Sequence, residues 1–336
     1  MAAPLFLSAQ ETYPLTKYLG QFFEQGYGNE GDEENLDLAA EGKKLYHAGW
    51  SYTLPEGFDT TGVHFADYSQ FDLDATFRLT DKIGEQQWQV RVPGPQDEVA
   101  RGIIPSLNPD FKMAAVVRQT DLYRPQEWVR PADQLLLYLL DASGTYDPLY
   151  IHEELGLAPV DIQTGEDYYY VLANAMDENQ FTYPTLLKIS TNGNLIWQRD
   201  FRVEGMNVLS HELVFTGNQE LFFPVNYVDE GLAGVVGFNT AGQQLNDPQH
   251  TPTQAYLYGI AADGNNRLWT AGYEFSEPAD TNALISRFTA QGLYDQHWRK
   301  GNTQGQQKFR DLVLHDQGLQ ALGTRTDTTE GSASIY

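Results

Sequence analysis

Leu-Leu-Lys-Ile-Ser-Thr-Asn-Gly-Asn-Leu-Ile-Trp, which spans residues 186–197, predicts a β-hairpin. Two apolar runs flank the pair Asn192-Gly193, and Asn-Gly is a strong signal for a tight turn between antiparallel strands. Gly193 suits this turn because glycine adopts positive φ at little cost. We therefore expect two paired strands on either side of residue 193.

The hairpin pattern recurs along the chain. The turn glycines of the related segments are Gly84, Gly144, Gly193, Gly242 and Gly292. The intervals between them are 60, 49, 49 and 50 residues. Near-equal intervals around one pattern indicate an internal repeat. A second strand–turn–strand unit precedes each hairpin, as in residues 168–177 and 221–229, so each repeat of about 50 residues holds four short strands.

Four short strands per repeat of this length predict an all-β fold, the β-propeller, in which each repeat forms one blade. Six repeats begin near residues 36, 101, 160, 207, 257 and 310, which predicts six four-stranded blades. The last repeat ends after its third strand, and residues 12–20 could supply the outer strand and close the ring. The expected single domain spans residues 11–336. A truncated propeller of seven or eight blades is the alternative.

Residues 1–10 resemble the end of a secretory signal peptide. A short apolar run, Pro4–Leu7, is followed by small residues and then by the polar Gln10. The stretch is similar to the Leu-x-Ala-Gln ends common in secreted proteins of the Bacteroidota. It therefore predicts a secreted, periplasmic or cell-surface protein, and a first strand is the alternative.

Composition excludes several functional classes. The chain has 336 residues, with 46 Asp and Glu against 21 Lys and Arg, so its formal net charge is −25. This excess of acid disfavours nucleic-acid binding, which needs clustered cations. The absence of Cys removes disulfide scaffolds and thiolate chemistry. No apolar run reaches the roughly 18 residues of a transmembrane segment.

The hairpin at residues 186–197 resembles the propeller repeats of secreted Bacteroidota proteins, and it is similar to the tryptophan-docking repeats of quinoprotein-like (PQQ-like) propellers. The stretch Ile260–Trp269 resembles the Asp-Gly-Asn element of sensor-type propellers. The resemblance covers roughly residues 36–336, and its motifs are structural. It implies a binding or scaffold module. Quinoprotein dehydrogenase activity would need eight blades and a longer chain, so we expect no cofactor.

The second repeat is about ten residues longer than the others, and the extra length falls in Asp121–Pro131. Exposed aromatic and Arg side chains are typical of binding hot spots, and loops on a rigid scaffold often carry function. A second long loop, Leu54–Gln70, carries further aromatic residues. The candidate binding residues are Tyr123, Arg124, Trp128, Arg130, Phe65 and Tyr68. The alternative for Trp128 is that it folds back onto its own blade.

No catalytic residue and no metal ligand is identified from the sequence. The acidic run Asn29–Asn35 could offer oxygen ligands to Ca²⁺, but its spacing does not match an EF-hand loop, and we expect a solvated loop. Asp161 and Asp311 hold similar positions near the start of two repeats, where a propeller strand lines the central channel. They could face inward as an acid pair, or they could form hydrogen bonds between blades.

These observations favour a non-catalytic module that binds a protein of the cell surface or envelope through loops on one face. The alternative is a propeller that binds or cleaves carbohydrate. An acid pair in the channel would favour the carbohydrate function, whereas a channel plugged by apolar side chains beside an aromatic loop patch would favour protein recognition. A sensor or structural role is a third possibility.

Overall fold

A computed structural model describes residues 33–41, 44–52, 73–81, 85–94, 96–123, 128–277, 280–300, 306–315, 318–326 and 333–335. Every regular element in these ranges is a β-strand. No helix long and apolar enough to cross a membrane occurs in the described part of the chain. The predicted all-β class is therefore confirmed.

Within the described residues the strands form six antiparallel sheets. The first contains β1 (Glu33–Glu41), β2 (Lys44–Tyr52), β3 (Leu73–Asp81) and β4 (Gln86–Val92). The second contains β5 (Asp97–Pro105), β6 (Met113–Thr120), β7 (Gln134–Leu140) and β8 (Tyr146–Ile151). The third contains β9 (Leu157–Gly165), β10 (Tyr168–Met176), β11 (Thr182–Ser190) and β12 (Leu195–Asp200).

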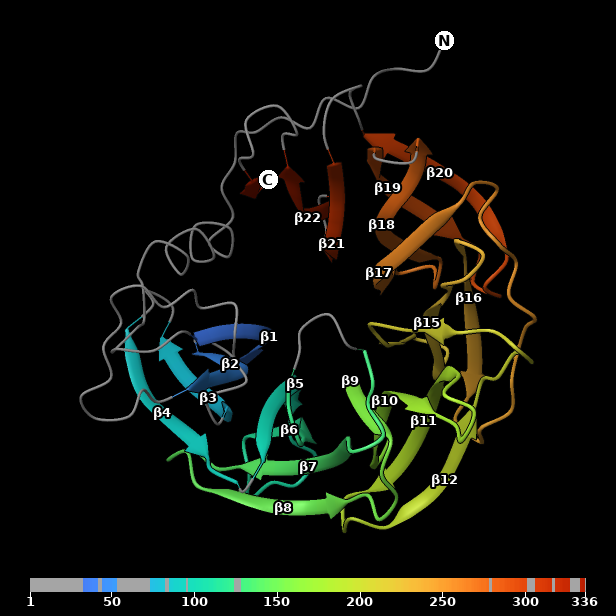
Figure 1. The fold of residues 1–336 in the computed structure, drawn as a ribbon. Coiled ribbons are helices and arrows are strands. Elements are labelled where there is room, and N and C mark those ends of the chain that lie inside the picture. The colour runs from blue at the N-terminus through green and yellow to red at the C-terminus, as the bar shows by residue number, and fades with distance from the viewer. Residues whose placement is uncertain are drawn as a thin grey trace.

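The remaining sheets follow the same order along the chain. The fourth contains β13 (Val208–Leu209), β14 (Val214–Phe215), β15 (Glu220–Tyr227) and β16 (Leu232–Asn239). The fifth contains β17 (Ala255–Ala262), β18 (Leu268–Glu277), β19 (Asp280–Phe288) and β20 (Tyr294–Lys300). The sixth contains β21 (Gln306–His315), β22 (Gly318–Thr326) and β23 (Ala333–Ile335). Figure 1 shows the sheets arranged around a common centre, with β5, β9, β17 and β21 nearest to it. This is the architecture of a β-propeller.

The predicted hairpin is present. Strands β11 and β12 pair antiparallel, with Leu187 opposite Gln198 and Lys188 opposite Trp197. Gly193 has φ of 78°, and the turn glycines of the next two repeats, Gly242 and Gly292, have φ of 79° and 74°. Glycine is needed there because L side chains rarely adopt this conformation. The predicted turn at Gly84 lies outside the described residues.

Tryptophans on outer strands pack against the turn of the next sheet. The Nε1 of Trp88 donates to the carbonyl of Ala142 at 3.0 Å, and that of Trp197 donates to the carbonyl of Thr240 at 3.3 Å. A Cβ on Gly144 would lie 3.1 Å from the Trp88 ring, and one on Gly242 would lie 3.2 Å from the Trp197 ring. The turn glycines therefore serve both the turn and the contact between sheets.

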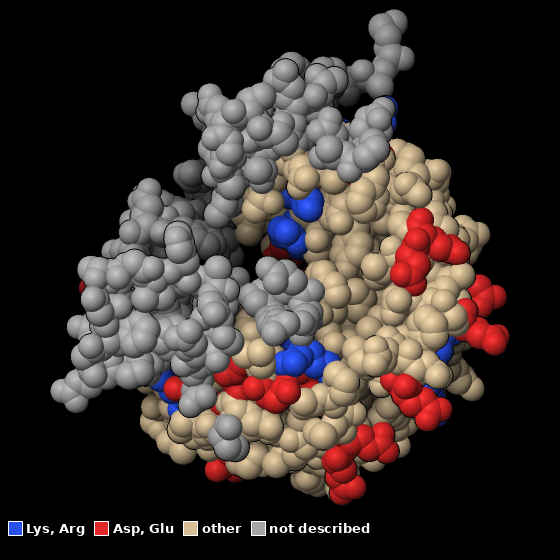
Figure 2. All heavy atoms as spheres, in the orientation of Figure 1, with Lys and Arg blue, Asp and Glu red and all other residues tan. Residues whose placement is uncertain are grey.

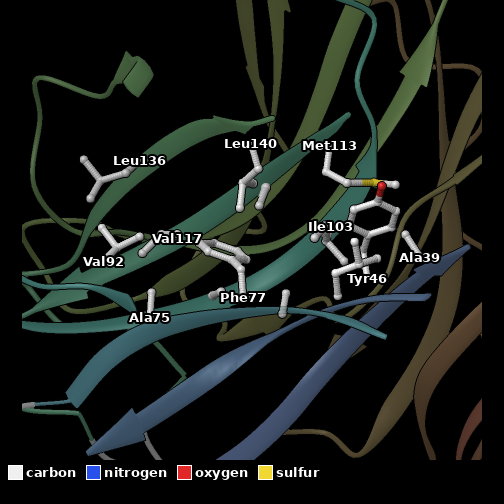
Figure 3. Packing of buried hydrophobic residues seen from close by; sticks show 14 residues of the cluster. Ala39, Tyr46, Ala75, Phe77, Val92, Ile103, Met113, Val117, Leu136 and Leu140 are labelled. Carbon is white, nitrogen blue, oxygen red and sulfur yellow. The ribbon is translucent and has the colours of Figure 1, made fainter. Parts of the chain in front are cut away.

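The hydrophobic core lies between neighbouring sheets. Between the first and second sheets, Phe77, Tyr46 and Met113 are fully buried together with Ile103 and Leu140 (Figure 3). Similar clusters join the second sheet to the third and the third to the fourth. The sheets are buried on both faces, so the strands in the middle of a sheet carry apolar side chains on both sides. Residues Leu135–Leu140 of β7 are an example.

Candidate functional site

In each sheet, the strand that lies nearest the centre of the molecule has one residue more than the stretch of strand with which it pairs. This extra residue falls at an equivalent position in the sheets. The register of β1, β5, β9, β17 and β21 shifts at Leu36, Arg101, Val160, Tyr258 and Arg310. In the fourth sheet, Leu209 pairs with Asn226 and Val214 with Phe222, so residues 210–213 lie opposite 223–225. A β-bulge bends its strand and re-aims a side chain, and bulges are frequent beside functional sites.

Six aromatic rings gather where the bulges of the fourth and fifth sheets meet. We call Trp128, His211, Tyr256, Tyr258, Tyr273 and Phe275 the aromatic cluster. Four of its ring contacts form a row from Trp128 to Phe275. The centroid distances along the row are 4.6 Å for Trp128–His211, 5.0 Å for His211–Tyr258, 6.0 Å for Tyr258–Tyr273 and 5.0 Å for Tyr273–Phe275.

The rings at the two ends of this row are exposed to solvent, and two other rings of the aromatic cluster, which we call its base, are buried. Trp128 is 36% exposed and Phe275 is 43% exposed, whereas Tyr256 and Tyr273 are each 8% exposed. The hydroxyl of Tyr256 is hydrogen-bonded to Nε2 of His211 at 2.8 Å, so the base is held rigidly. Trp128 and Phe275 therefore offer exposed ring surface to a ligand at the two ends of a pre-organised cluster.

Three cations lie against this cluster. The guanidinium of Arg310 lies 4.3 Å from the ring centroid of Tyr258, and the ammonium of Lys308 lies 4.6 Å from that of Tyr273. Arg101, at the bulge of β5, is close enough for its charge to act on His211. Figure 2 shows Lys and Arg side chains around a hollow in the middle of this face, with an acidic side chain deeper inside.

His211 is uncharged. Burial, and then the positive charges of Arg101 and Arg310, lower the pKa of His211 to about 3. A neutral imidazole can stack on Trp128 and exchange a hydrogen bond with Tyr256 without adding a fourth charge. Among the described residues, the positive charge of the site at neutral pH therefore comes from Arg101, Lys308 and Arg310 rather than from His211. Burial and the charge of Arg310 lower the pKa of Lys308.

Carboxyl groups follow the bulge in four of the sheets. Asp37 accepts hydrogen bonds from the N–H groups of Leu38 and Ile103 at 2.7 Å, and Asp161 accepts from Ile162 and Leu213 at 2.6 and 2.7 Å. Ile103 and Leu213 belong to the next sheet along the chain, so these two carboxyl groups join neighbouring sheets.

Within the described residues, Glu212 and Asp311 each accept one hydrogen bond from a backbone N–H, whereas Asp37 and Asp161 each accept two. Glu212 accepts from the N–H of Ile260 in the fifth sheet at 2.6 Å, and Asp311 accepts from Leu312 at 2.6 Å. The hydrogen bonds between sheets that were one alternative for Asp161 are thus present, whereas Asp311 bonds to its own strand.

Burial and mutual repulsion act on these four groups. Burial raises the pKa of Asp37 to about 6, with a smaller contribution from the charge of Asp311. Burial, and then the charge of Asp37, raise the pKa of Asp161 well above its usual range. Burial and the charges of Asp311 and Asp161 do the same for Glu212. In the described part of the chain, no His, Asp and Glu side chains form a cluster suited to a metal ion.

The structure describes three of the predicted binding residues, and they differ in their surroundings. Trp128 is exposed and joins the aromatic cluster, so it contacts His211 of another sheet rather than folding back onto its own. Tyr123 is 3% exposed and packs against Trp50, so its expected exposure is wrong. Arg130 is half-buried and pairs with Asp121 of its own loop at 2.7 Å. Arg124, Phe65 and Tyr68 lie outside the described residues.

Sequence reasoning missed most of the site. His211, Tyr258, Arg101 and Arg310 were not predicted, although the predicted repeat starts near residues 101, 257 and 310 fall at or beside three of them. The bulge residues range from Leu36 and Val160 to Tyr258 and two arginines, so no motif marks them. The one available signal was the following position, which is Asp, Glu or Gly in every repeat.

Comparison with solved structures shows the fold alone. The chain is similar to a protein of unknown function from Dyadobacter fermentans DSM 18053, with a TM-score of 0.57 and 11% identity over 92% of this chain and 94% of that chain. The present chain has a β-propeller fold. It is also similar to a neuraminidase-like protein from A/bat/Guatemala/164/2009, with a TM-score of 0.50 and 10% identity over 93% of this chain and 91% of that chain.

The β-propeller domain of the Trilobed protease from Pyrococcus furiosus aligns with a TM-score of 0.49 and 10% identity over 92% of this chain and 81% of that chain. No protein-family model and no curated protein matches the sequence.

Proposed function

We propose that this propeller binds a carbohydrate on the aromatic cluster at the mouth of its channel. The observation that carries the proposal is the row of rings from Trp128 to Phe275, which is exposed at both ends and buried at its base. Aromatic ring faces carry partial negative charge, and the C–H groups of a sugar carry partial positive charge, so the two surfaces attract each other. Binding sites also combine aromatic walls with a few polar groups, as this one does.

The distribution of side chains favours this function over recognition of an envelope protein through the long loop. Tyr123 is buried and Arg130 is engaged by Asp121, so the loop offers Trp128 as its exposed anchor among the described residues. Trp128 lies against the channel mouth. Four carboxyl groups follow the bulges of the innermost strands, and the charges of Asp311 and Asp161 act on Glu212. An acid pair in the channel was the feature expected of a carbohydrate propeller.

We favour binding over cleavage because the carboxyl groups are already occupied. Both oxygens of Asp37 and both oxygens of Asp161 accept backbone N–H groups. A general acid or base needs a free oxygen directed at the substrate. These two aspartates therefore hold sheets together.

Glu212 supports cleavage as a second candidate function. The pKa of Glu212 is raised by burial and then by the charge of Asp311. Within the described residues, Oε2 is the oxygen that accepts a hydrogen bond, from the N–H of Ile260. A carboxyl group with a raised pKa beside a second carboxyl group is the arrangement of an acid and its partner in glycoside hydrolysis. Reducing ends released from a bound oligosaccharide, and lost in Glu212→Gln, would support this candidate.

Isothermal titration calorimetry with a panel of oligosaccharides tests the binding proposal. We expect Tyr258→Ala to weaken binding of the recognised glycan at least tenfold, because the ring lies in the middle of the row. The control is Trp298→Ala, which removes an exposed ring that stacks on Trp269 in the outer part of the fifth sheet. Equal loss in both variants, or no binding by the unmodified protein, would contradict the proposal.

We further propose that the ring has six blades and that residues 12–20 complete the last one. The sixth sheet has three described strands where the other sheets have four, and β23 is at its edge. An added strand would cover that edge. We also propose export from the cytoplasm, supported by the resemblance of residues 1–10 to a signal peptide.

A further inference from the structure

The three cations at the channel mouth have no ion pair within the described residues, unlike six other arginines there. Within the described residues, no carboxylate lies within ion-pair distance of Arg101, Lys308 or Arg310. Six other arginines do pair with a carboxylate, namely Arg118, Arg130, Arg202, Arg267, Arg287 and Arg299. In a chain with 46 acidic and 21 basic residues, unpaired cations gathered at one place need an explanation.

The fold holds these cations at the mouth. Arg101 and Arg310 occupy the bulges of β5 and β21, where the extra residue turns the side chain away from the ladder. Arg310 packs over Tyr258 and Lys308 over Tyr273, so the aromatic cluster fixes both charged groups. The charges of Arg101 and Arg310 both reach His211, which places them near the same ring.

The carboxyl groups deeper in the channel do not neutralise them. Asp37, Asp161, Glu212 and Asp311 each bond to backbone N–H groups, and their pKa values are raised. The site thus has a layer of cations at its opening and, below it, carboxyl groups whose pKa values are raised.

Another hollow on the molecule shows the contrast. Residues that include Tyr183, Arg202 and Met206 line a hollow of about 380 Å³ between the third and fourth sheets. Its arginine is already held, because Arg202 pairs with Asp200 at 2.7 Å and stacks on Tyr183 at 3.8 Å. The arginine of that hollow is thus paired with a carboxylate, whereas within the described residues no carboxylate pairs with the three cations at the channel mouth.

We infer that the sugar bound at the channel mouth carries a carboxylate, as a uronate does; this inference rests on the proposed carbohydrate-binding function. A sugar ring stacked on Tyr258 would place a carboxylate substituent beside Arg310. Guanidinium groups match the planar carboxylate with two parallel hydrogen bonds. The net charge of −25 repels dense polyanions, so one carboxylate per sugar fits better than multiple sulfate or phosphate groups.

Calorimetric titration with matched pairs of ligands tests this inference. The probes are trigalacturonate and trimannuronate, each beside the neutral trisaccharide of the same linkage, namely galactotriose and mannotriose. We expect at least one uronate trimer to bind tenfold or more tightly than its neutral partner. We expect Arg310→Gln and Arg101→Gln to weaken uronate binding about 10- to 100-fold and to weaken binding of the neutral trimer much less.

The control variant is Lys112→Gln, which removes the same charge from an exposed lysine that pairs with Glu41 at 3.7 Å. Its uronate affinity should match that of the unmodified protein, and circular dichroism should show each variant folded. Equal affinity for uronate and neutral trimers would overturn the inference and leave the carbohydrate-binding proposal standing. Absence of binding by all four trimers would overturn both.

Discussion

Glu212 illustrates how one side chain serves both the fold and the channel. Its Oε2 accepts the N–H of Ile260 in the next sheet, and a Cβ on the adjoining Gly259 would lie 3.1 Å from the same oxygen. The charge of Glu212 is opposed by burial and by Asp311 and Asp161. The hydrogen bond therefore stabilises the fold, whereas the negative charge destabilises it at neutral pH.

We predict that Glu212→Gln raises the melting temperature at pH 7.5 by about 2 °C. Because the pKa of Glu212 is raised in the folded protein, the folded state binds its proton more tightly than the unfolded state does. The cost of the charge is therefore present above the folded pKa and disappears as the pH falls below it. Melting curves at pH 7.5 and pH 4.5 check this. A lower melting temperature at both pH values would show that the carboxylate is itself required.

Asn226 carries a contact between sheets with two hydrogen bonds. Its Nδ2 donates to the carbonyl of Leu257 at 2.8 Å and its Oδ1 accepts from the N–H of Leu257 at 2.6 Å. Asn174 makes the equivalent pair with Ser210 one sheet earlier. All four residues are buried, so their backbone groups have no access to water as a replacement.

Replacing Asn226 by Ala should lower the free energy of unfolding by about 3 kcal/mol, since two buried backbone groups lose their partners. Urea unfolding measures this directly, and Asn174→Ala should behave alike. The exposed Asn265 provides a control, because Asn265→Ala should change stability by less than about 0.5 kcal/mol. A loss below about 1 kcal/mol in Asn226→Ala would contradict the role assigned to this contact.

At the scale of the elements, the hairpins were predictable and the bulges were not. Asn192-Gly193 and its counterparts encode a local turn, and local turns depend on few residues. Gly193 and Gly242 indeed adopt positive φ. A bulge instead depends on how a strand pairs with its neighbour, and the apolar pattern of a strand buried on both faces does not show an extra residue. The site residues Tyr258 and Arg310 sit on bulges, so the site remained unpredicted.

Gly242 should tolerate no side chain. It has φ of 79°, and an added Cβ would lie 3.2 Å from the Trp197 ring. We expect Gly242→Ala to lower the free energy of unfolding by about 1–3 kcal/mol. The matched control is Gly264→Ala, because no atom lies within 4 Å of an added Cβ at Gly264. Equal stability of the two variants in urea would contradict the docking of Trp197 on this turn.

At the scale of the whole molecule, the repeat architecture was predictable from the sequence because similar units must stack to bury their faces. The core clusters between successive sheets confirm this stacking. Closure of the ring was not settled by repeats, since it depends on a pairing between distant parts of the chain. The kind of ligand could not be predicted from the sequence either, because the residues at the channel mouth come from several sheets, with one or two from each.

Removal of residues 1–30 tests closure by the N-terminal strand. If residues 12–20 pair with β23, the truncated protein should melt at least about 5 °C lower, since the last sheet then keeps an open edge. Removal of residues 1–10 alone serves as the control and should leave the melting temperature unchanged. Identical melting of the two truncations in calorimetry would argue against closure by this segment.

A crystal structure of the protein with a uronate trimer tests the central claim most directly. We predict electron density for a sugar ring over Tyr258, between Trp128 and Phe275, with its carboxylate at Arg310. The stacked pair Trp269 and Trp298, with Arg287 beside both rings, is the competing aromatic surface in the described structure. Sugar density on that pair, or an empty channel mouth in crystals soaked at saturating concentration, would contradict the assignment of the channel mouth as the binding site.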